Sequence, residues 1–160
     1  MRHAGTLILV LIVYFGMSAY QTSGAASGEA PPIDALTING EGFSLSTLRG
    51  QPVLVHFWAS WCPSCRMMEE QLATVANAED YQVITVAVRS GQPVALRAYL
   101  EEAAVEFPVI ADANGALAST YGVTALPTSF YVDADGQIHG TEVGMSSAWG
   151  MKVRLWWAGL

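Results

Sequence analysis

Positive charge is scarce in this sequence. Seven lysine and arginine residues stand against fourteen aspartate and glutamate residues, which gives a net charge of −7, and Lys152 is the single lysine. Proteins that bind nucleic acid neutralise phosphates with clustered cations. The composition therefore argues against a nucleic-acid partner.

Cysteine is also scarce, because Cys62 and Cys65 are the only two. One pair excludes the several bridges that hold small secreted domains together, and it cannot alone supply the four ligands of a closed zinc site. The pair lies in the stretch WASWCPSCR, residues 58–66. The surrounding sequence must decide between a structural disulfide, a metal site and a redox catalyst.

Charge is absent from residues 4–20, which read AGTLILVLIVYFGMSAY, and Arg2 precedes them. This pattern predicts a signal peptide or a signal anchor over residues 1–20. The run is at the short limit of a membrane-spanning helix, for which about 20 residues are usual. The small residues Ser23 and Ala25 permit cleavage after Ala25. In either case the positive flank predicts that the remaining chain lies outside the cytoplasm.

Residues 21–32, QTSGAASGEAPP, are small and polar and end in two prolines. Such a composition predicts a flexible linker, and residues 33–160 are then expected to form one domain.

The domain alternates strand-like and helix-like segments, which predicts an α/β fold. We expect a mixed central sheet with helices on both faces, preceded by an N-terminal β-hairpin, and we expect Trp149, Trp156 and Trp157 to pack the last helix on the sheet. The predicted strands are 36–38, 43–45, 53–58, 81–88, 107–110, 128–132 and 137–143, and the predicted helices are 63–77, 93–104, 115–121 and 146–157.

The cysteine pair falls where the strand 53–58 gives way to a helix. Pro63 suits the first helical position, because its missing N–H would be unpaired there anyway. Cys62 is then expected at the helix N-terminus, where free N–H groups and the helix dipole lower a thiol pKa from about 8.5. Cys65 follows one turn later. This arrangement favours thiol–disulfide exchange, with Cys62 as the attacking thiol and Cys65 as the resolving thiol.

Two other interpretations of the pair remain open. A structural disulfide would close a loop too short to add much stability. A Cu(I) site could combine the two cysteines with His56, or with Met67 and Met68 as soft donors.

A second segment is expected to join the site. Pro127 opens the strand 128–132, which is unusual unless the proline sits at an edge or in a special turn. A cis bond between Leu126 and Pro127 would place the Leu126 backbone against the sulfurs, where an extended substrate could pair with it. Trp61 offers a flat apolar rim for a peptide substrate, or it packs as an ordinary core residue.

These features together resemble the thioredoxin superfamily. WASWCPSC is similar to its active-site segment, and Pro127 matches its cis-proline. The closer resemblance is to the membrane-tethered TlpA/ResA/DsbE group, whose D-x-x-G, Y-G-V and P-T-x-F-x-V-D-x-x-G pattern is similar to residues 112–136. Within the group, residues 53–58 and 144–157 look most like the ScsD-type protein disulfide oxidoreductases, which are linked to copper tolerance in the bacterial periplasm.

Two positions depart from the group. Many members carry a buried glutamate three residues after the second cysteine, where this chain has Met68, and Glu69 is expected on another face. Thioredoxin has an aspartate at the position of His56. We hypothesise that His56 relays protons to and from Cys65, because an imidazole pKa near 6.5 suits that work. Thr128 replaces the glutamate that follows the cis-proline in cytochrome c maturation reductases.

The resemblance implies a thioredoxin-like enzyme, a protein thiol–disulfide oxidoreductase on the periplasmic side of the bacterial inner membrane. It implies a reductant that is itself reduced by a membrane electron donor of the DsbD/ScsB type, with a Cys62–Cys65 disulfide as its redox group and no further cofactor or metal. The alternatives are a periplasmic Cu(I) carrier, a cytochrome c maturation thiol reductase, and a substrate-docking fold without turnover.

Overall fold

The computed structural model describes Gly16 and residues 24–160. The predicted signal segment and the start of the predicted linker therefore lie outside the described residues, apart from Gly16. Within the described part of the chain, no helix has both the length and the apolar character needed to span a membrane.

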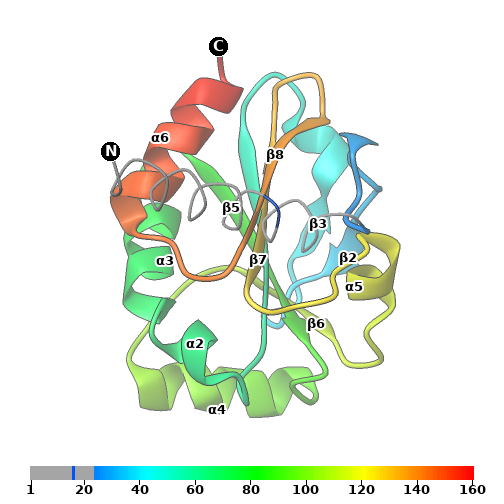
Figure 1. The fold of residues 1–160 in the computed structure, drawn as a ribbon. Helices are drawn as coiled ribbons and strands as arrows, with labels where there is room; N and C mark the ends of the chain where they lie inside the picture. The colour runs from blue at the N-terminus through cyan, green and yellow to red at the C-terminus, as the bar shows by residue number, and fades with distance from the viewer. Residues whose placement is uncertain (1–15, 17–23) are drawn as a thin grey trace.

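Six strands form one mixed sheet in the order β1-β8-β7-β4-β5-β6 (Figure 1). The strands β4, β5 and β6 run parallel, and β7, β8 and β1 add to them in antiparallel fashion. Their bounds are Gly28–Glu29 (β1), Val53–Trp58 (β4), Gln82–Val88 (β5), Val109–Asp112 (β6), Thr128–Val132 (β7) and Gln137–Val143 (β8).

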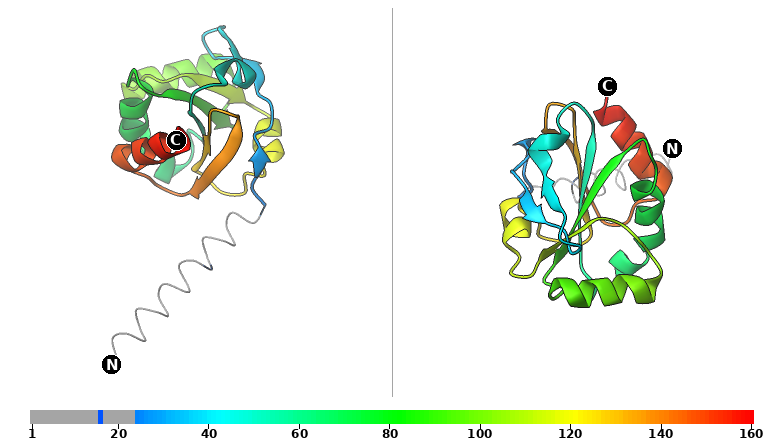
Figure 2. Two further views of the ribbon diagram at one scale, coloured as in Figure 1. Left: turned by 90° about the horizontal axis from the view of Figure 1, so that it is seen from above. Right: turned by 180° about the vertical axis from the view of Figure 1, so that it is seen from behind.

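Helices cover both faces of the sheet, as predicted, and Figure 2 shows α6 and α5 on opposite sides of it. One core cluster joins the sheet to α3, α4 and α6, and a second joins its other face to α5 and η1. The bounds are Leu45–Leu48 (η1, a 3₁₀ helix), Pro63–Arg66 (α2), Glu69–Ala76 (α3), Pro93–Ala103 (α4), Ala116–Thr120 (α5) and Ala148–Ala158 (α6).

The central strand β4 shows why the sheet forms here. All six of its residues are buried. Val53, Val55 and Phe57 face the second cluster, while Leu54 and Trp58 face the first. A strand covered on both faces reads as a continuous apolar run, which is the pattern that the sequence shows.

The predicted N-terminal hairpin is present as β2 (Asp34–Leu36) and β3 (Gly42–Ser44), which pair antiparallel. The predicted turn 133–136 also joins β7 to β8, with the Gly136 N–H donating to the Asp133 carbonyl at 2.9 Å.

The predicted linker is wrong over its second half. Gly28 and Glu29 form β1 and pair with the edge strand β8, and Ala26 N–H donates to the Tyr121 carbonyl at 2.9 Å. Gly122 permits this approach, because a Cβ there would lie 1.9 Å from the Gly24 carbonyl oxygen. The sequence did not predict this two-residue strand, because pairing at the edge of a sheet uses backbone hydrogen bonds and requires no particular pattern of side chains.

The predicted helix 63–77 is interrupted at Met67 and Met68. The Met68 N–H donates to the Cys65 carbonyl at 2.9 Å, three residues back, as in a 3₁₀ turn, and a new series begins where Leu72 N–H donates to Met68. The interruption turns the start of α3 relative to α2, which decides where Glu69 points.

The expectation for the three C-terminal tryptophans is also wrong. Trp149, Trp156 and Trp157 are 76%, 61% and 61% exposed. The helix α6 packs on the sheet with Met151, Leu155 and Ala158 instead, and Ser147 caps it by accepting from Gly150 N–H. These three smaller residues repeat at the helical spacing, so the tryptophans fall on the opposite side.

Candidate active site

Cys62 lies at the carboxyl end of the central strand, where β4 ends at Trp58 and α2 begins at Pro63. It is the N-cap residue of α2, with extended backbone (φ −91°, ψ 113°), and Pro63 occupies the first turn. This is the position that the sequence predicts for the attacking thiol.

Both thiols are free and buried, with 5% of Cys62 and 2% of Cys65 exposed. The Cys62 Sγ lies 3.2 Å from the Ser64 Oγ and donates to the Leu126 carbonyl at 3.8 Å. The Leu126–Pro127 bond is cis, as hypothesised, and the loop before β7 places the Leu126 carbonyl next to the Cys62 sulfur.

The surroundings of Cys62 favour its thiolate. Burial acts to raise the pKa, but hydrogen bonds from the Cys65 and Ser64 side chains and from the backbone of the same two residues outweigh it, so the pKa of Cys62 is lowered. The helix α2 is only four residues long, so these local donors stabilise the charge more than a helix dipole does.

Cys65 has the opposite tendency. The pKa of Cys65 is raised to about 12, mainly by burial, with smaller contributions from the hydrogen bond with Cys62 and from the charges of Cys62 and Glu69; a backbone hydrogen bond with Ala59 acts in the opposite direction. The first thiol therefore ionises more readily than the second, which keeps its proton at neutral pH, and disulfide exchange requires this difference between the two thiols.

Glu69 lies on a different side of the chain from Met68, as expected, and it is a buried acidic residue near the cysteine pair. It is only 8% exposed, and the Tyr99 hydroxyl donates a hydrogen bond to its Oε1. Its charge is close enough to raise the pKa of Cys65. Glu69 is thus a buried carboxylate near Cys65, one position after Met68.

His56 lies on the strand beneath the pair, on the sheet face that it shares with Leu54 and Trp58. Its Nδ1 is 2.9 Å from the Ser129 Oγ on the neighbouring strand β7. Burial lowers the pKa of His56 to about 4, so the imidazole is neutral at physiological pH. The expectation that His56 keeps a pKa near 6.5 is therefore wrong.

Two exposed side chains border the thiols. Trp61 is 60% exposed and its Nε1–H donates to the Arg89 carbonyl at 3.2 Å, which fixes one edge of the ring while the remainder faces solvent. Met67 is 71% exposed. Trp61 thus has the placement of a substrate rim rather than of a core residue.

The soft donors considered for Cu(I) do not converge on the cysteines. The Met68 sulfur accepts a hydrogen bond from the Ser146 N–H at 3.4 Å, His56 pairs with Ser129, and Met67 is exposed to solvent.

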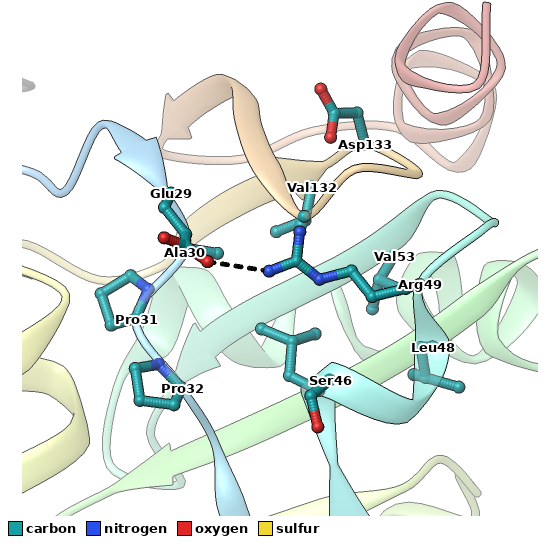
Figure 3. Close-up of a pocket in the computed structure, with 12 residues that line it drawn as sticks. Glu29, Ala30, Pro31, Pro32, Ser46, Leu48, Arg49, Val53, Val132 and Asp133 are labelled. Carbon is teal, nitrogen blue, oxygen red and sulfur yellow. Dashed lines mark hydrogen bonds and ion pairs between the residues drawn. The ribbon is translucent and has the colours of Figure 1, made fainter.

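A cavity of about 380 Å³ lies at the other end of the sheet, near the first residue of β4. Figure 3 shows Arg49 reaching across it to Glu29, and their ion pair measures 2.9 Å. Pro31 and Pro32 line the same hollow. It marks where the N-terminal segment packs on the domain, and it holds none of the redox chemistry.

Comparison with known proteins decides the family. A family model described as the AhpC/TSA family matches residues 26–141. The chain belongs to this family.

Individual members of the AhpC/TSA family resemble the chain over most of its length. A thioredoxin-like protein of Haemophilus influenzae is 30% identical over 159 residues, which cover 99% of this chain and 94% of that protein. The thiol-disulfide oxidoreductase ResA of Bacillus subtilis is 29% identical over 140 residues, 82% of this chain and 78% of ResA. The crystal structure of StoA from Bacillus subtilis matches with a TM-score of 0.69 and 26% identity, covering 78% of this chain and 96% of StoA.

These relatives confirm the thioredoxin-like fold and the resemblance to the TlpA/ResA/DsbE group. They also confirm the predicted enzyme class, a thiol–disulfide oxidoreductase.

The pKa difference between the thiols predicts how alkylation depends on pH. In the reduced protein, the rate of modification by iodoacetamide is expected to rise with pH as Cys62 ionises, with a midpoint below the pKa of about 8.5 that a free thiol shows. Mass spectrometry should find the label on Cys62, while Cys65 stays unlabelled at neutral pH. In guanidinium, which unfolds the protein, both thiols should react at similar rates. Similar rates for Cys62 and Cys65 in the folded protein would contradict the assignment of Cys62 as the attacking thiol.

Proposed function

We propose that the protein is exported and acts on the periplasmic side of the bacterial inner membrane as a reductant of disulfides in proteins. The observation that carries this proposal is the unequal environment of the two thiols beside the Leu126 carbonyl. The surroundings of Cys62 favour its thiolate, those of Cys65 keep its proton, and the Leu126 carbonyl lies next to the Cys62 sulfur.

The reaction that fits the site has two exchange steps. The Cys62 thiolate attacks a substrate disulfide, which breaks that bond, forms a mixed disulfide and releases one substrate sulfur that takes up a proton. Cys65 then loses its proton and attacks the Cys62 sulfur, which releases the second substrate thiol. Two electrons pass to the substrate, and the Cys62–Cys65 disulfide is the oxidised product.

The backbone of Leu126 is proposed to hold the substrate. Its carbonyl already receives the Cys62 thiol, and Pro127 behind it is buried, so an extended peptide would meet a fixed carbonyl. Backbone pairing with an extended segment gives affinity without demanding one particular side chain. The exposed Trp61 ring would add an apolar contact from the other side.

The N-terminal segment is proposed to tether the enzyme. Residues 4–20 are uncharged and follow Arg2, which is the basis for a signal anchor. A tethered reductant must itself be reduced after each cycle, and a membrane electron donor of the DsbD/ScsB type suits that task. A role in copper tolerance, as in ScsD-type proteins, stays a prediction.

Two groups are candidates to accept the Cys65 proton. We propose Glu69 as the acceptor, because its charge acts on Cys65 and its carboxylate is held by Tyr99. His56 remains the second candidate, in the form of a neutral imidazole fixed by Ser129.

One experiment separates the proposed reductant from a Cu(I) carrier. The fully reduced protein is assayed for insulin reduction and for bound Cu(I), before and after Cys62 is alkylated. A reductant is expected to lose insulin reduction on alkylation and to show a measurable two-electron reduction potential against glutathione. A protein that binds one Cu(I) tightly and exchanges no disulfides would overturn the proposal. Met67→Leu serves as the control, because it removes a soft donor and leaves both thiols.

A further inference from the structure

The helix α6 carries an apolar face that does not pack on the sheet. Trp149, Val153 and Trp156 follow one another at the helical spacing of four and three residues, with Trp157 beside them. All four are exposed, and the three tryptophans expose more than half of their surface. Leu160, just past the helix, is 84% exposed. Contiguous apolar patches of this kind mark interaction sites in soluble domains.

The charges on α6 narrow the choice of partner. The helix contains Lys152 and Arg154 and no acidic residue, in a chain whose net charge is −7. Arg154 forms an ion pair with Glu142 on β8 at 2.9 Å, which offsets its charge, so Lys152 supplies the positive charge that α6 offers to a partner. This charge beside the tryptophans suits a negatively charged surface.

The chemistry of tryptophan suits the surface of a bilayer. Its ring is apolar and its indole N–H is polar, and tryptophan is enriched at the boundary between lipid and water. Helices with tryptophan on one side and lysine or arginine on the other lie in the plane of this boundary. A second copy of the chain fits less well, because a symmetric contact through α6 would oppose the cations of each copy.

The helix α6 and the N-terminal segment meet the domain at the same edge of the sheet, although Ala25 and Ala26 pack on the face opposite to α6. Trp157 packs edge-on against His139 of β8, with ring centroids 5.7 Å apart. The same strand pairs on its free edge with β1, so the N-terminal segment joins the domain beside it. Ala25 and Ser27 border a hollow that they share with Gly140 and Thr141, and these two residues also border the hollow under Trp157. The apolar run 4–20 lies directly upstream in the sequence.

We propose that the tryptophan face of α6 docks on the anionic phospholipid surface of the membrane that the chain is tethered to. The N-terminal segment would hold the domain near the bilayer, and α6 would fix how the domain is turned. This inference assumes the proposed tether but not the thiol chemistry, so insulin reduction can fail while docking holds, and the reverse.

The test uses the full chain in nanodiscs that hold one copy each, made from phosphatidylethanolamine and phosphatidylglycerol. Phospholipids with brominated chains replace part of the lipid and quench any tryptophan that touches them. Because three of the five tryptophans lie on the α6 face, quenching of more than half of the emission is expected. Trp61→Phe should keep this quenching, and the triple variant Trp149→Phe, Trp156→Phe, Trp157→Phe should lose most of it.

Two further measurements sharpen the result. Lys152→Glu, or zwitterionic lipid in place of phosphatidylglycerol, is expected to weaken the quenching, and added salt should act in the same direction. If the quenching is lost in Trp61→Phe and kept in the triple variant, the proposal is overturned, because the active site would then face the lipid. It is equally overturned if bromine has no effect on the parent, or if the α6 tryptophans become protected only when the protein is concentrated in detergent, which would indicate a second copy.

Discussion

Cys62→Ser is expected to abolish insulin reduction, with a loss of at least about 10³-fold, as removal of a nucleophile typically causes. Cys65→Ser is expected to behave differently, because Cys62 can still attack while nothing resolves the product. The Cys65→Ser protein should accumulate mixed disulfides with its substrates. Non-reducing gels and mass spectrometry of the trapped species measure this difference, and trapping in cell envelopes would also identify the physiological substrates.

The matched control for this pair is Ser64→Ala. Ser64 lies between the cysteines, and its hydroxyl is 3.2 Å from the Cys62 sulfur. Its removal should raise the pKa of Cys62 and slow exchange only modestly at neutral pH, since the other hydrogen bonds remain. If instead Cys62→Ser traps substrate and Cys65→Ser does not, the roles of the two thiols are reversed from those proposed.

The central strand and the position of the cysteine pair could be predicted from the sequence, because a buried strand has a recognisable residue pattern. The run from Val53 to Trp58 is apolar at every position except His56, and such a run requires cover on both faces. The cysteine pair after it then falls at the carboxyl end of a central strand. Pro63 and Pro127 mark the two backbone positions that matter, because proline restricts the chain wherever it stands.

The burial of Glu69 and its hydrogen-bond partner could not be predicted from the sequence. A continuous helix was expected over residues 63–77. The 3₁₀ turn at Met68 alters that register, and Tyr99, which holds the carboxylate, comes from the distant helix α4. A hydrogen bond to a residue thirty positions away leaves no local pattern.

The tryptophans of α6 show a different limit. Residue type alone predicts burial for large aromatic side chains. Either of two apolar stripes on α6 could have faced the sheet, and the structure buries the one with Met151 and Leu155. These two residues belong to the core cluster that includes α3 and the strands, and such contacts between distant segments leave no pattern within α6 itself.

Glu69→Gln is expected to slow the resolving step by about 10²-fold at pH 7, the lower range for loss of a general base. The charge of Glu69 helps to raise the pKa of Cys65, so the variant should also lower that pKa. The loss of the proton acceptor slows the resolving step and the lower pKa of Cys65 speeds it, and measuring the rate at several pH values separates the two effects. Below the pKa of Cys65 the missing acceptor dominates, whereas at high pH hydroxide removes the proton and the variant should approach the parent. Stopped-flow decay of a preformed mixed disulfide measures the rate.

His56→Ala is the matched comparison for Glu69→Gln, because the two candidates differ in what they should do to the pH profile. With a pKa of about 4, the imidazole carries no charge across the range in which Cys65 titrates. The His56→Ala protein is therefore expected to resolve mixed disulfides with the pH profile of the parent. It is also expected to be less stable, because the Ser129 hydroxyl loses its buried partner at a cost of about 1–3 kcal/mol. Ser129→Ala would report the stability effect alone. If His56→Ala changes the profile and Glu69→Gln does not, the proton passes through the imidazole, and the inward turn of α3 serves packing rather than catalysis.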